Sequence, residues 1–172
     1  MFSAYIGMGS NLDDPLQQLQ VATRRLAELS VSGCMRVSAF YRNPAMWAPG
    51  LPEQPDFVNA VARIDVQLTP HALLAQLHTI EAQHQRRRND GMRWGPRTLD
   101  LDLLVYADSI INDERLSLPH PGLEYRPFVV LPLAEIEPQL IIPGRGRVAE
   151  LASRHDGTQL QRIDPWADNV SV

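Results

Sequence analysis

The sequence predicts an α+β protein in which helices cover a mainly antiparallel β-sheet. Segments with the alternating apolar pattern of strands stand on both sides of two amphipathic helical segments, and polar turns join most of them. With 172 residues and a hydrophobic fraction of 44%, the chain can bury one core. We therefore expect a single domain over residues 1–172, with a core at about 3–155 and a polar tail at about 156–172.

The chain begins with an apolar segment, SAYIGMGSNL, that predicts a buried strand ending in a turn of small residues. Asp14 and Pro15 follow, and an acidic residue before a proline is typical of a helix start. Apolar residues then recur at helical spacing as far as Leu29. This pattern predicts an amphipathic helix that packs on the sheet.

Two strand segments and a second helix come next. MRVSAFYRN alternates as a strand at about residues 35–42, and FVNAVARIDVQL alternates again from Phe57, with Val58, Ala60, Ala62 and Ile64 on one face. Residues 44–56 between them carry four prolines, which predicts a long loop, and long loops in compact domains are usually functional. Thr69 and Pro70 then predict the start of a second amphipathic helix.

The remaining segments are shorter. An arginine-rich loop at residues 85–98 leads into the strand LDLDLLVY, and SLPHPGLEYRPFVVLPLAEI predicts a proline-punctuated loop followed by a short helix. LIIPGRG predicts a last strand and a turn. The order strand, helix, paired strands, helix, strand favours a ferredoxin-like core with additions.

All sixteen basic residues are arginines, and the chain has no lysine. Mechanisms that need a Schiff-base lysine or a phosphate-loop lysine are therefore excluded, and any bound phosphate must be held by arginine. The net charge is −4, yet positive charge is concentrated in one short segment. A small anionic ligand is favoured over a long nucleic-acid track. The residues of this segment are Arg86, Arg87, Arg88, Arg93 and Arg97.

Cysteine content and hydropathy exclude further classes. Cys34 is the only cysteine, so an intramolecular disulfide and a multi-cysteine zinc site are excluded, and we expect Cys34 to be a small buried hydrophobe. No segment has the length and hydropathy of a membrane span, and the N-terminus lacks the basic region of a signal peptide. We therefore expect a cytoplasmic protein with no membrane partner.

Asp100 and Asp102 lie on the same face of a predicted strand, about 7 Å apart along it, while the intervening leucines face the other way. Aspartate is disfavoured in strands, so two on one face require a compensating cation, either an adjacent arginine or a metal. Magnesium fits, because it binds through one or two carboxylates and substrate phosphates. The alternative is a half-buried strand with a solvated outer face.

Other motifs are weaker. Gly7-x-Gly9 lacks the third glycine of a dinucleotide fingerprint, and Arg86–Arg88 can also be the solvated end of a helix, with Arg87 the bystander. The helical histidines His71, His78 and His84 are interpreted as surface residues, whereas His120, among prolines, is the better site candidate.

The segment RWGPRTLDLDLL, residues 93–104, resembles the signature of the 6-hydroxymethyl-7,8-dihydropterin pyrophosphokinase family. The resemblance extends through AYIGMGSNL, SAFYRNP, QPDFVNAV, IEAQ, NDERLSLPHP and RPFVVLPLAEI, and covers roughly residues 3–145. It implies a three-layer αβα sandwich around the ferredoxin-like core. It also implies transfer of pyrophosphate from MgATP to the hydroxymethyl group of 6-hydroxymethyl-7,8-dihydropterin, giving AMP and the dihydropterin diphosphate for folate biosynthesis.

Carried over by position, the resemblance implies roles for individual residues. Asp100 and Asp102 would hold two magnesium ions and, with Arg86 and Arg97, would be catalytic. The residues implied for ATP are Glu81, Arg86, Arg88, Arg97, Leu103, Arg115, His120 and Arg126. Those implied for the pterin are Asn43, Pro44, Met46, Phe57, Asn59, Trp94 and Phe128. We expect a monomer with small-molecule substrates and no nucleic-acid partner.

Two other functions stay open at this point. A ferredoxin-like sheet can present aromatic residues to bases as an RNA-binding module, although the aspartate pair would repel a phosphate backbone without a metal. A non-catalytic relative could bind pterin or nucleotide without turnover. The chain also departs from the family pattern in its longer proline-rich loop, in an additional residue near 89–91 and in Phe57, where the family often has tyrosine.

Overall fold

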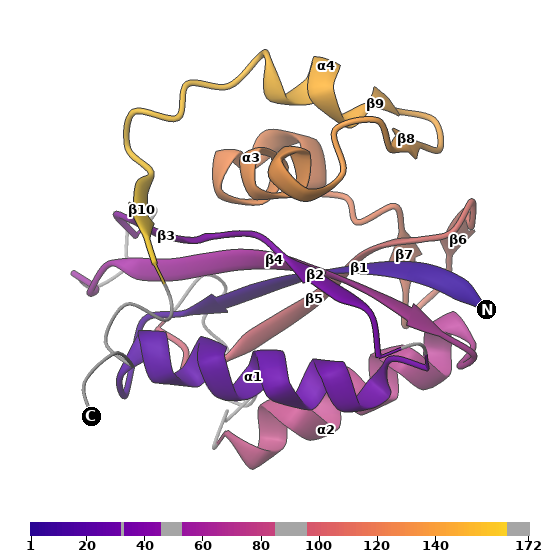
Figure 1. The fold of residues 1–172 in the computed structure, drawn as a ribbon, viewed down its shortest axis with the longest axis horizontal. Coiled ribbons are helices and arrows are strands. Elements are labelled where there is room, and N and C mark those ends of the chain that lie inside the picture. Colours follow the sequence, from indigo (N-terminus) through magenta and orange to yellow (C-terminus); the bar gives the residue numbers. More distant parts are fainter. Residues whose placement is uncertain (32, 46–52, 85–95, 165–172) are drawn as a thin grey trace.

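The computed structural model describes residues 1–31, 33–45, 53–84 and 96–164 (Figure 1). Its helices are α1 (Pro15–Leu29), α2 (Pro70–Gln83), η2 (Leu123–Tyr125), α3 (Pro127–Ile136) and α4 (Val148–Ala152). Its strands are β1 (Phe2–Ser10), β2 (Met35–Val37), β3 (Phe40–Asn43), β4 (Phe57–Val66), β5 (Asp100–Tyr106), β6 (Ile111–Asn112), β7 (Ser117–Leu118), β8 (Ile141–Ile142), β9 (Gly146–Arg147) and β10 (Gln161–Ile163).

The described elements form three layers, with α1 and α2 on one side of the main sheet and α3 and α4 on the other (Figure 1). Among the described residues, six strands make this sheet in the order β10-β3-β4-β1-β5, with β2 also paired to β4. Every pairing in it is antiparallel. Strands β3, β4, β1 and β5 with crossovers α1 and α2 make the predicted ferredoxin-like core, so the α+β prediction is confirmed.

Both faces of the sheet are buried, because apolar side chains leave each central strand in both directions. Val58, Ala60, Ala62 and Ile64 of β4 pack with α1 and α2, as their alternation predicts. Val61 on the opposite face packs with α3 and α4. The start of β5, at one end of the sheet, carries polar side chains instead.

The two long helices begin where the sequence predicts. The Asp14 side chain caps α1 by accepting the Gln17 N–H at 3.2 Å, and Pro15 follows at the first helical position. Thr69 caps α2 by accepting the Ala72 N–H at 3.3 Å. Each cap gives a partner to a backbone donor that the helix itself leaves without one.

The structure differs from the sequence prediction at three places. The strand expected at 35–42 is split into β2 and β3, because Ser38 turns inward and its hydroxyl accepts the Val61 N–H at 3.0 Å. Part of the segment expected to be a polar tail forms β10, which pairs with β3. Cys34 is exposed, so the expectation of a buried residue was wrong, since Cys34 lies in the connection between α1 and β2.

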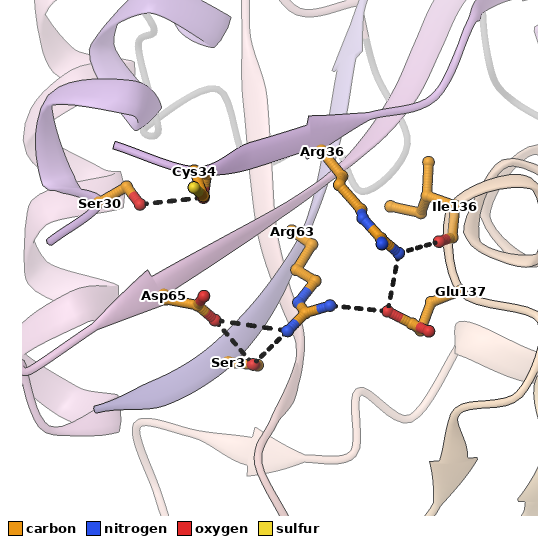
Figure 2. Close-up of polar contacts among 8 residues, drawn as sticks. All are labelled: Ser3, Ser30, Cys34, Arg36, Arg63, Asp65, Ile136 and Glu137. Carbon is orange, nitrogen blue, oxygen red and sulfur yellow. Dashed lines mark hydrogen bonds and ion pairs between the residues drawn. The ribbon is translucent and has the colours of Figure 1, made fainter. Parts of the chain in front are cut away.

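Polar contacts attach the C-terminal end of α3 to the sheet (Figure 2). Arg63 of β4 binds the Glu137 carboxylate at 2.8 Å, and Arg36 of β2 reaches the same carboxylate at 3.4 Å and the Ile136 carbonyl at 3.2 Å. Arg63 also donates to the Ser3 hydroxyl at 3.1 Å. These contacts hold the C-terminal end of α3 against β2 and β4.

No helix in the described part of the chain combines the length and the apolar character that crossing a membrane requires.

We predict that Glu81→Ala lowers the free energy of unfolding by about 1–3 kcal/mol, because it leaves a buried amide without its acceptor. Glu81 is 1% exposed and accepts the Leu101 N–H of β5 at 2.9 Å. Urea denaturation measures the change. Glu28→Ala is the matched control, because the Glu28 side chain is 61% exposed and its ion pair with Arg25 contributes little. Equal losses in the two variants would contradict the prediction.

Candidate active site

Two aspartates and two glycines meet on adjacent strands at one end of the sheet. Asp100 and Asp102 of β5 lie in register with Gly9 and Gly7 of β1. The leucines between and beside the aspartates pack on the α1 and α2 side, so both carboxylates face the α3 side. Because glycine has no side chain, Gly9 leaves room for the Asn59 amide and Gly7 lets the Leu104 side chain pack closely against β1.

Arginines neutralise both carboxylates. Arg97 forms an ion pair with Asp100, and Arg126, directly before α3, binds Asp102 at 3.1 Å between Nη1 and Oδ2. The Asp100 and Asp102 side chains keep exposed fractions of 20% and 34%. Like charges on one face repel each other, so these arginines supply the compensating cations that the sequence requires.

His120 lies beside the pair, with Nε2 at 3.8 Å from Asp102 Oδ2. Its Nδ1 accepts the Gly122 N–H at 3.1 Å, so the neutral ring carries its proton on Nε2, toward the carboxylate. Burial lowers the pKa of the His120 imidazole, although the charge of Asp102 acts in the opposite direction. The His120 ring is therefore neutral at pH 7, with its Nε2–H toward Asp102.

A first cavity, here called the inner pocket, lies between β1, β4 and the start of α3. Phe57 at the start of β4 and Phe128 at the start of α3 both line it. Asn59 donates to the Asn43 side-chain oxygen at 2.6 Å, and both amides are buried. The other lining residues are Gly7, Met8, Gly9, Ala60, Arg97, Asp100, Asp102, Arg126 and Val129. Aromatic side chains with a few fixed polar groups suit a flat heterocycle.

A second cavity, the outer pocket, opens at the free edge of β5. Apolar side chains line one part of it and basic ones another: Leu74, Leu101, Leu103, Leu116 and Pro121, then His78, Arg115 and His120, with Ser117 beside them. Arg97, Asp100 and Asp102 line this pocket as well as the inner one. Two ligands bound in the two pockets would therefore meet at the aspartate pair.

The pockets bring together most of the residues that the sequence singles out. Asn43, Phe57, Asn59 and Phe128, expected for the pterin, line the inner pocket. Arg126, expected for ATP, lines the inner pocket too, while Leu103, Arg115 and His120 line the outer one. Two expected residues, Glu81 and Pro44, do not line either cavity, and Glu81 instead binds the β5 backbone. Met46, Arg86, Arg88 and Trp94 lie outside the described residues.

Sequence reasoning missed several lining residues. His78 was interpreted as a surface residue, yet it faces the outer pocket together with Leu74. The two are four residues apart on α2, and that spacing places them on one face of a helix. Gly7, Gly9 and Met8 were assigned only to a strand and its turn, because their part in the inner pocket depends on the pairing of β1 with β5.

The donor set fits magnesium better than a tighter-binding metal. Within the described part of the chain, no group of three or more histidine, cysteine, aspartate or glutamate residues is placed to hold a metal ion. A magnesium ion needs only one or two protein carboxylates, since water and phosphate oxygens complete its shell. Asp100 and Asp102 offer that number of carboxylates beside arginines that can bind the same phosphates.

Comparisons with known proteins show the family of this chain. The model of a family described as 7,8-dihydro-6-hydroxymethylpterin-pyrophosphokinase (HPPK) matches residues 5–138. A 2-amino-4-hydroxy-6-hydroxymethyldihydropteridine pyrophosphokinase of Haemophilus influenzae is 40% identical over 165 residues, which are 96% of this chain and 100% of that protein. A protein of the same name from Methylorubrum extorquens is 42% identical over 164 residues, covering 95% of this chain and 100% of its own.

Solved structures show a similar fold. A crystal structure of wild-type Plasmodium falciparum HPPK-DHPS with SDX-DHP has a TM-score of 0.68 at 13% sequence identity and covers 95% of this chain. The match covers 47% of that chain, so this protein spans about half the length of the solved one. The same protein with pteroate has a TM-score of 0.69 at 11% identity, covering 94% of this chain and 48% of the other. At these identities the likeness concerns the fold alone.

We predict that Gly9→Ala weakens binding of 6-hydroxymethylpterin about tenfold, the effect of losing roughly one hydrogen bond. A Cβ atom at this position would lie 2.8 Å from Asn59 Oδ1, so the Asn59 amide must rotate away from Asn43. Fluorescence titration measures the affinity. If the effect acts through Asn59, adding Gly9→Ala to Asn59→Ala should change the affinity less than twofold or so. Full additivity of the two changes would contradict this reasoning.

Proposed function

Because the chain belongs to the 7,8-dihydro-6-hydroxymethylpterin-pyrophosphokinase family, we propose that the inner and outer pockets are the places where the family's reaction occurs. The protein is an enzyme of folate synthesis that transfers pyrophosphate from ATP to 6-hydroxymethyl-7,8-dihydropterin. One observation supports this assignment of the pockets above all others. Arg97, Asp100 and Asp102 line both cavities, so the donor and the acceptor can meet there.

The inner pocket is the proposed pterin site. Phe57 and Phe128 provide apolar contact area for the faces of a bicyclic ring, and Asn59 and Asn43 provide an amide edge for its polar atoms. The two amides bind each other at 2.6 Å and are buried, so their orientation is set before the ligand arrives. A preorganised site of this kind loses little entropy on binding.

The outer pocket is the proposed ATP site. Leu74 and Leu103 offer an apolar surface for the base, while Arg97, Arg115 and His120 offer donors for the phosphates. Arginine remains charged at any working pH and binds phosphate oxygens with two donors at once. For six residues the proposal rests on family resemblance. At the nucleotide these are Glu81, Arg86 and Arg88. At the pterin they are Pro44, Met46 and Trp94.

Asp100 and Asp102 are the proposed magnesium ligands, and we propose two ions. Magnesium supplies positive charge to the phosphate oxygens when it is bound. The carboxylates contribute hard oxygen donors between the two pockets, and Arg97 and Arg126 balance their charge in its absence. Since the arginines are paired with the same carboxylates, they lie next to the phosphates as these arrive.

The transfer itself forms a bond between the pterin hydroxymethyl oxygen and the β-phosphorus of ATP. The bond from the β-phosphorus to the oxygen that bridges it to the α-phosphorus breaks, AMP leaves, and the hydroxyl proton is lost. The protein's residues hold the two reactants in line and balance the negative charge on the phosphate oxygens, which is most of the catalysis in phosphoryl-type transfer. Arg97 reaches both pockets and is the described arginine placed for this role.

Two further expectations stay predictions. We propose that the enzyme acts as a monomer, because side chains of one chain build both pockets. We also propose that it works in the cytoplasm, where its co-substrate ATP is made and used. Sedimentation and cell fractionation test these two points.

We predict that Asp100→Asn and Asp102→Asn each lower turnover about 100-fold or more, since each removes a carboxylate ligand of the magnesium that would neutralise the phosphate oxygens. The assay mixes enzyme, ATP, magnesium and 6-hydroxymethyl-7,8-dihydropterin, and follows AMP and the dihydropterin diphosphate. Wild-type enzyme should form both products in equal amounts, and a chelator should stop both. Asp108→Asn is the control, because Asp108 is exposed in the turn after β5. Normal magnesium-dependent turnover in both site variants would refute the assignment, and ATP binding without AMP release by wild-type protein would indicate a binding-only relative.

We predict that Arg97→Ala slows the transfer step by about 10²–10³-fold, in the range seen when one charge-stabilising donor is removed. ATP affinity should change much less, because Arg115 and His120 still line the outer pocket. Single-turnover quench experiments separate the transfer rate from nucleotide binding. Arg25→Ala serves as the control, since Arg25 of α1 does not line either pocket. An unchanged transfer rate in Arg97→Ala would rule out this role.

A further inference from the structure

Asn11, the residue that follows β1, both donates a hydrogen bond to the Arg97 backbone and accepts one from it. Its backbone N–H donates to the Arg97 carbonyl at 3.0 Å, and its side-chain Oδ1 accepts the Arg97 N–H at 2.7 Å. Asn11 is 2% exposed and does not line either pocket. Arg97 stands three positions before Asp100, and both of its backbone polar groups are therefore bound by one buried residue, Asn11.

The other end of the same side chain holds a different segment. Asn11 Nδ2 donates to the Gln54 side-chain oxygen at 3.3 Å and to the Pro55 carbonyl at 3.2 Å. Pro55 stands two residues before Phe57, at the entry to β4 and to the inner pocket. The Asn11 amide group thus connects the segment that leads into β4 and the inner pocket with the backbone of Arg97.

We propose that Asn11 is a positioning residue that fixes the segment leading into the pterin pocket, at Gln54 and Pro55, relative to the phosphate-binding Arg97. The proposal rests on the proposed function of the two pockets and adds a residue that touches neither substrate. In-line transfer depends on the distance between the acceptor oxygen and the phosphorus, and a misplacement of about 1 Å can cost roughly 100-fold in rate. A direct hydrogen-bonded connection between the residues of the two substrate sites limits variation in that distance.

The side-chain chemistry explains why asparagine serves here. An amide carries an acceptor and two donors on one short, planar group, so it can bind an N–H on one side and two carbonyl oxygens on the other. Aspartate has the acceptor but no donor, and alanine has neither. The substitutions therefore separate the two halves of the link.

The central test compares Asn11→Asp with Asn11→Ala. Aspartate keeps an acceptor for the Arg97 N–H but places an oxygen against Gln54 and Pro55. We expect Asn11→Asp to raise the pterin KM about tenfold while kcat and the ATP KM change less than about threefold. Asn11→Ala should also lower kcat, by about tenfold or more, because the Arg97 contact is lost as well.

Gln54→Ala keeps the test decisive even if the Asn11 variants fold poorly, because Gln54 is only half-buried. It should raise the pterin KM about two- to fivefold alone, and much less in the Asn11→Asp background, where the contact is already broken. Tyr106→Phe is the stability control. It removes a hydrogen bond of a buried side chain to the Leu68 carbonyl at the opposite end of β5 and should leave all three kinetic constants unchanged.

Two results would overturn the proposal. The first is that the Asn11 variants lose stability as Tyr106→Phe does but keep the wild-type pterin KM and kcat. The second is that Asn11→Asp and Asn11→Ala change all three constants alike. Wild-type turnover in the same assay tests the proposed function separately. Should the wild-type protein bind both substrates without turnover, the pterin affinities of these variants would decide the Asn11 proposal instead.

Discussion

The architecture of this site depends on one electrostatic constraint, the placement of two carboxylates on the same face of β5. Side by side on a sheet, Asp100 and Asp102 repel each other unless cations stand next to them. Arg97 and Arg126 fill that role from opposite directions, one from the segment before β5 and one from the start of α3. Arginine side chains are also the groups that bind phosphate ligands. The stability of the folded protein and the binding of a phosphate therefore both require positive charge in this region.

The surrounding fold keeps this charged end of the sheet open and rigid. Gly7 and Gly9 face the two carboxylates in register and line the inner pocket, while the rest of β1 is buried between two apolar layers. Helix α3 carries Arg126 and Phe128 at its start, and its other end is held to the sheet by Arg63 through Glu137. The helix that carries Phe128 in the inner pocket is thus also attached to the sheet at its other end, outside the pocket.

Much of this could be read from particular residues in the sequence. The alternation in β4 predicted its two faces, Asp14 and Thr69 predicted the starts of α1 and α2, and the Asp-x-Asp spacing predicted the shared face of the carboxylates. Local patterns of this kind reflect backbone geometry, which repeats every two residues in strands and every 3.6 in helices. Ser38 and Cys34 escaped prediction, because their environment depends on which strand lies beside them, and sequence spacing does not report that.

By itself, then, the sequence determined the α+β class, the helix starts, the acidic strand and, through its signature, the family. Only the tertiary structure decided that Asp100 and Asp102 stand between two pockets, that Gly9 makes room for Asn59, and that Asn11 joins Arg97 to the start of β4. These residues lie 40 to 90 positions apart or so, and a contact over that separation depends on strand order and register. Strand order is a property of the whole packed chain, which minimises exposed apolar area and unpaired polar groups together.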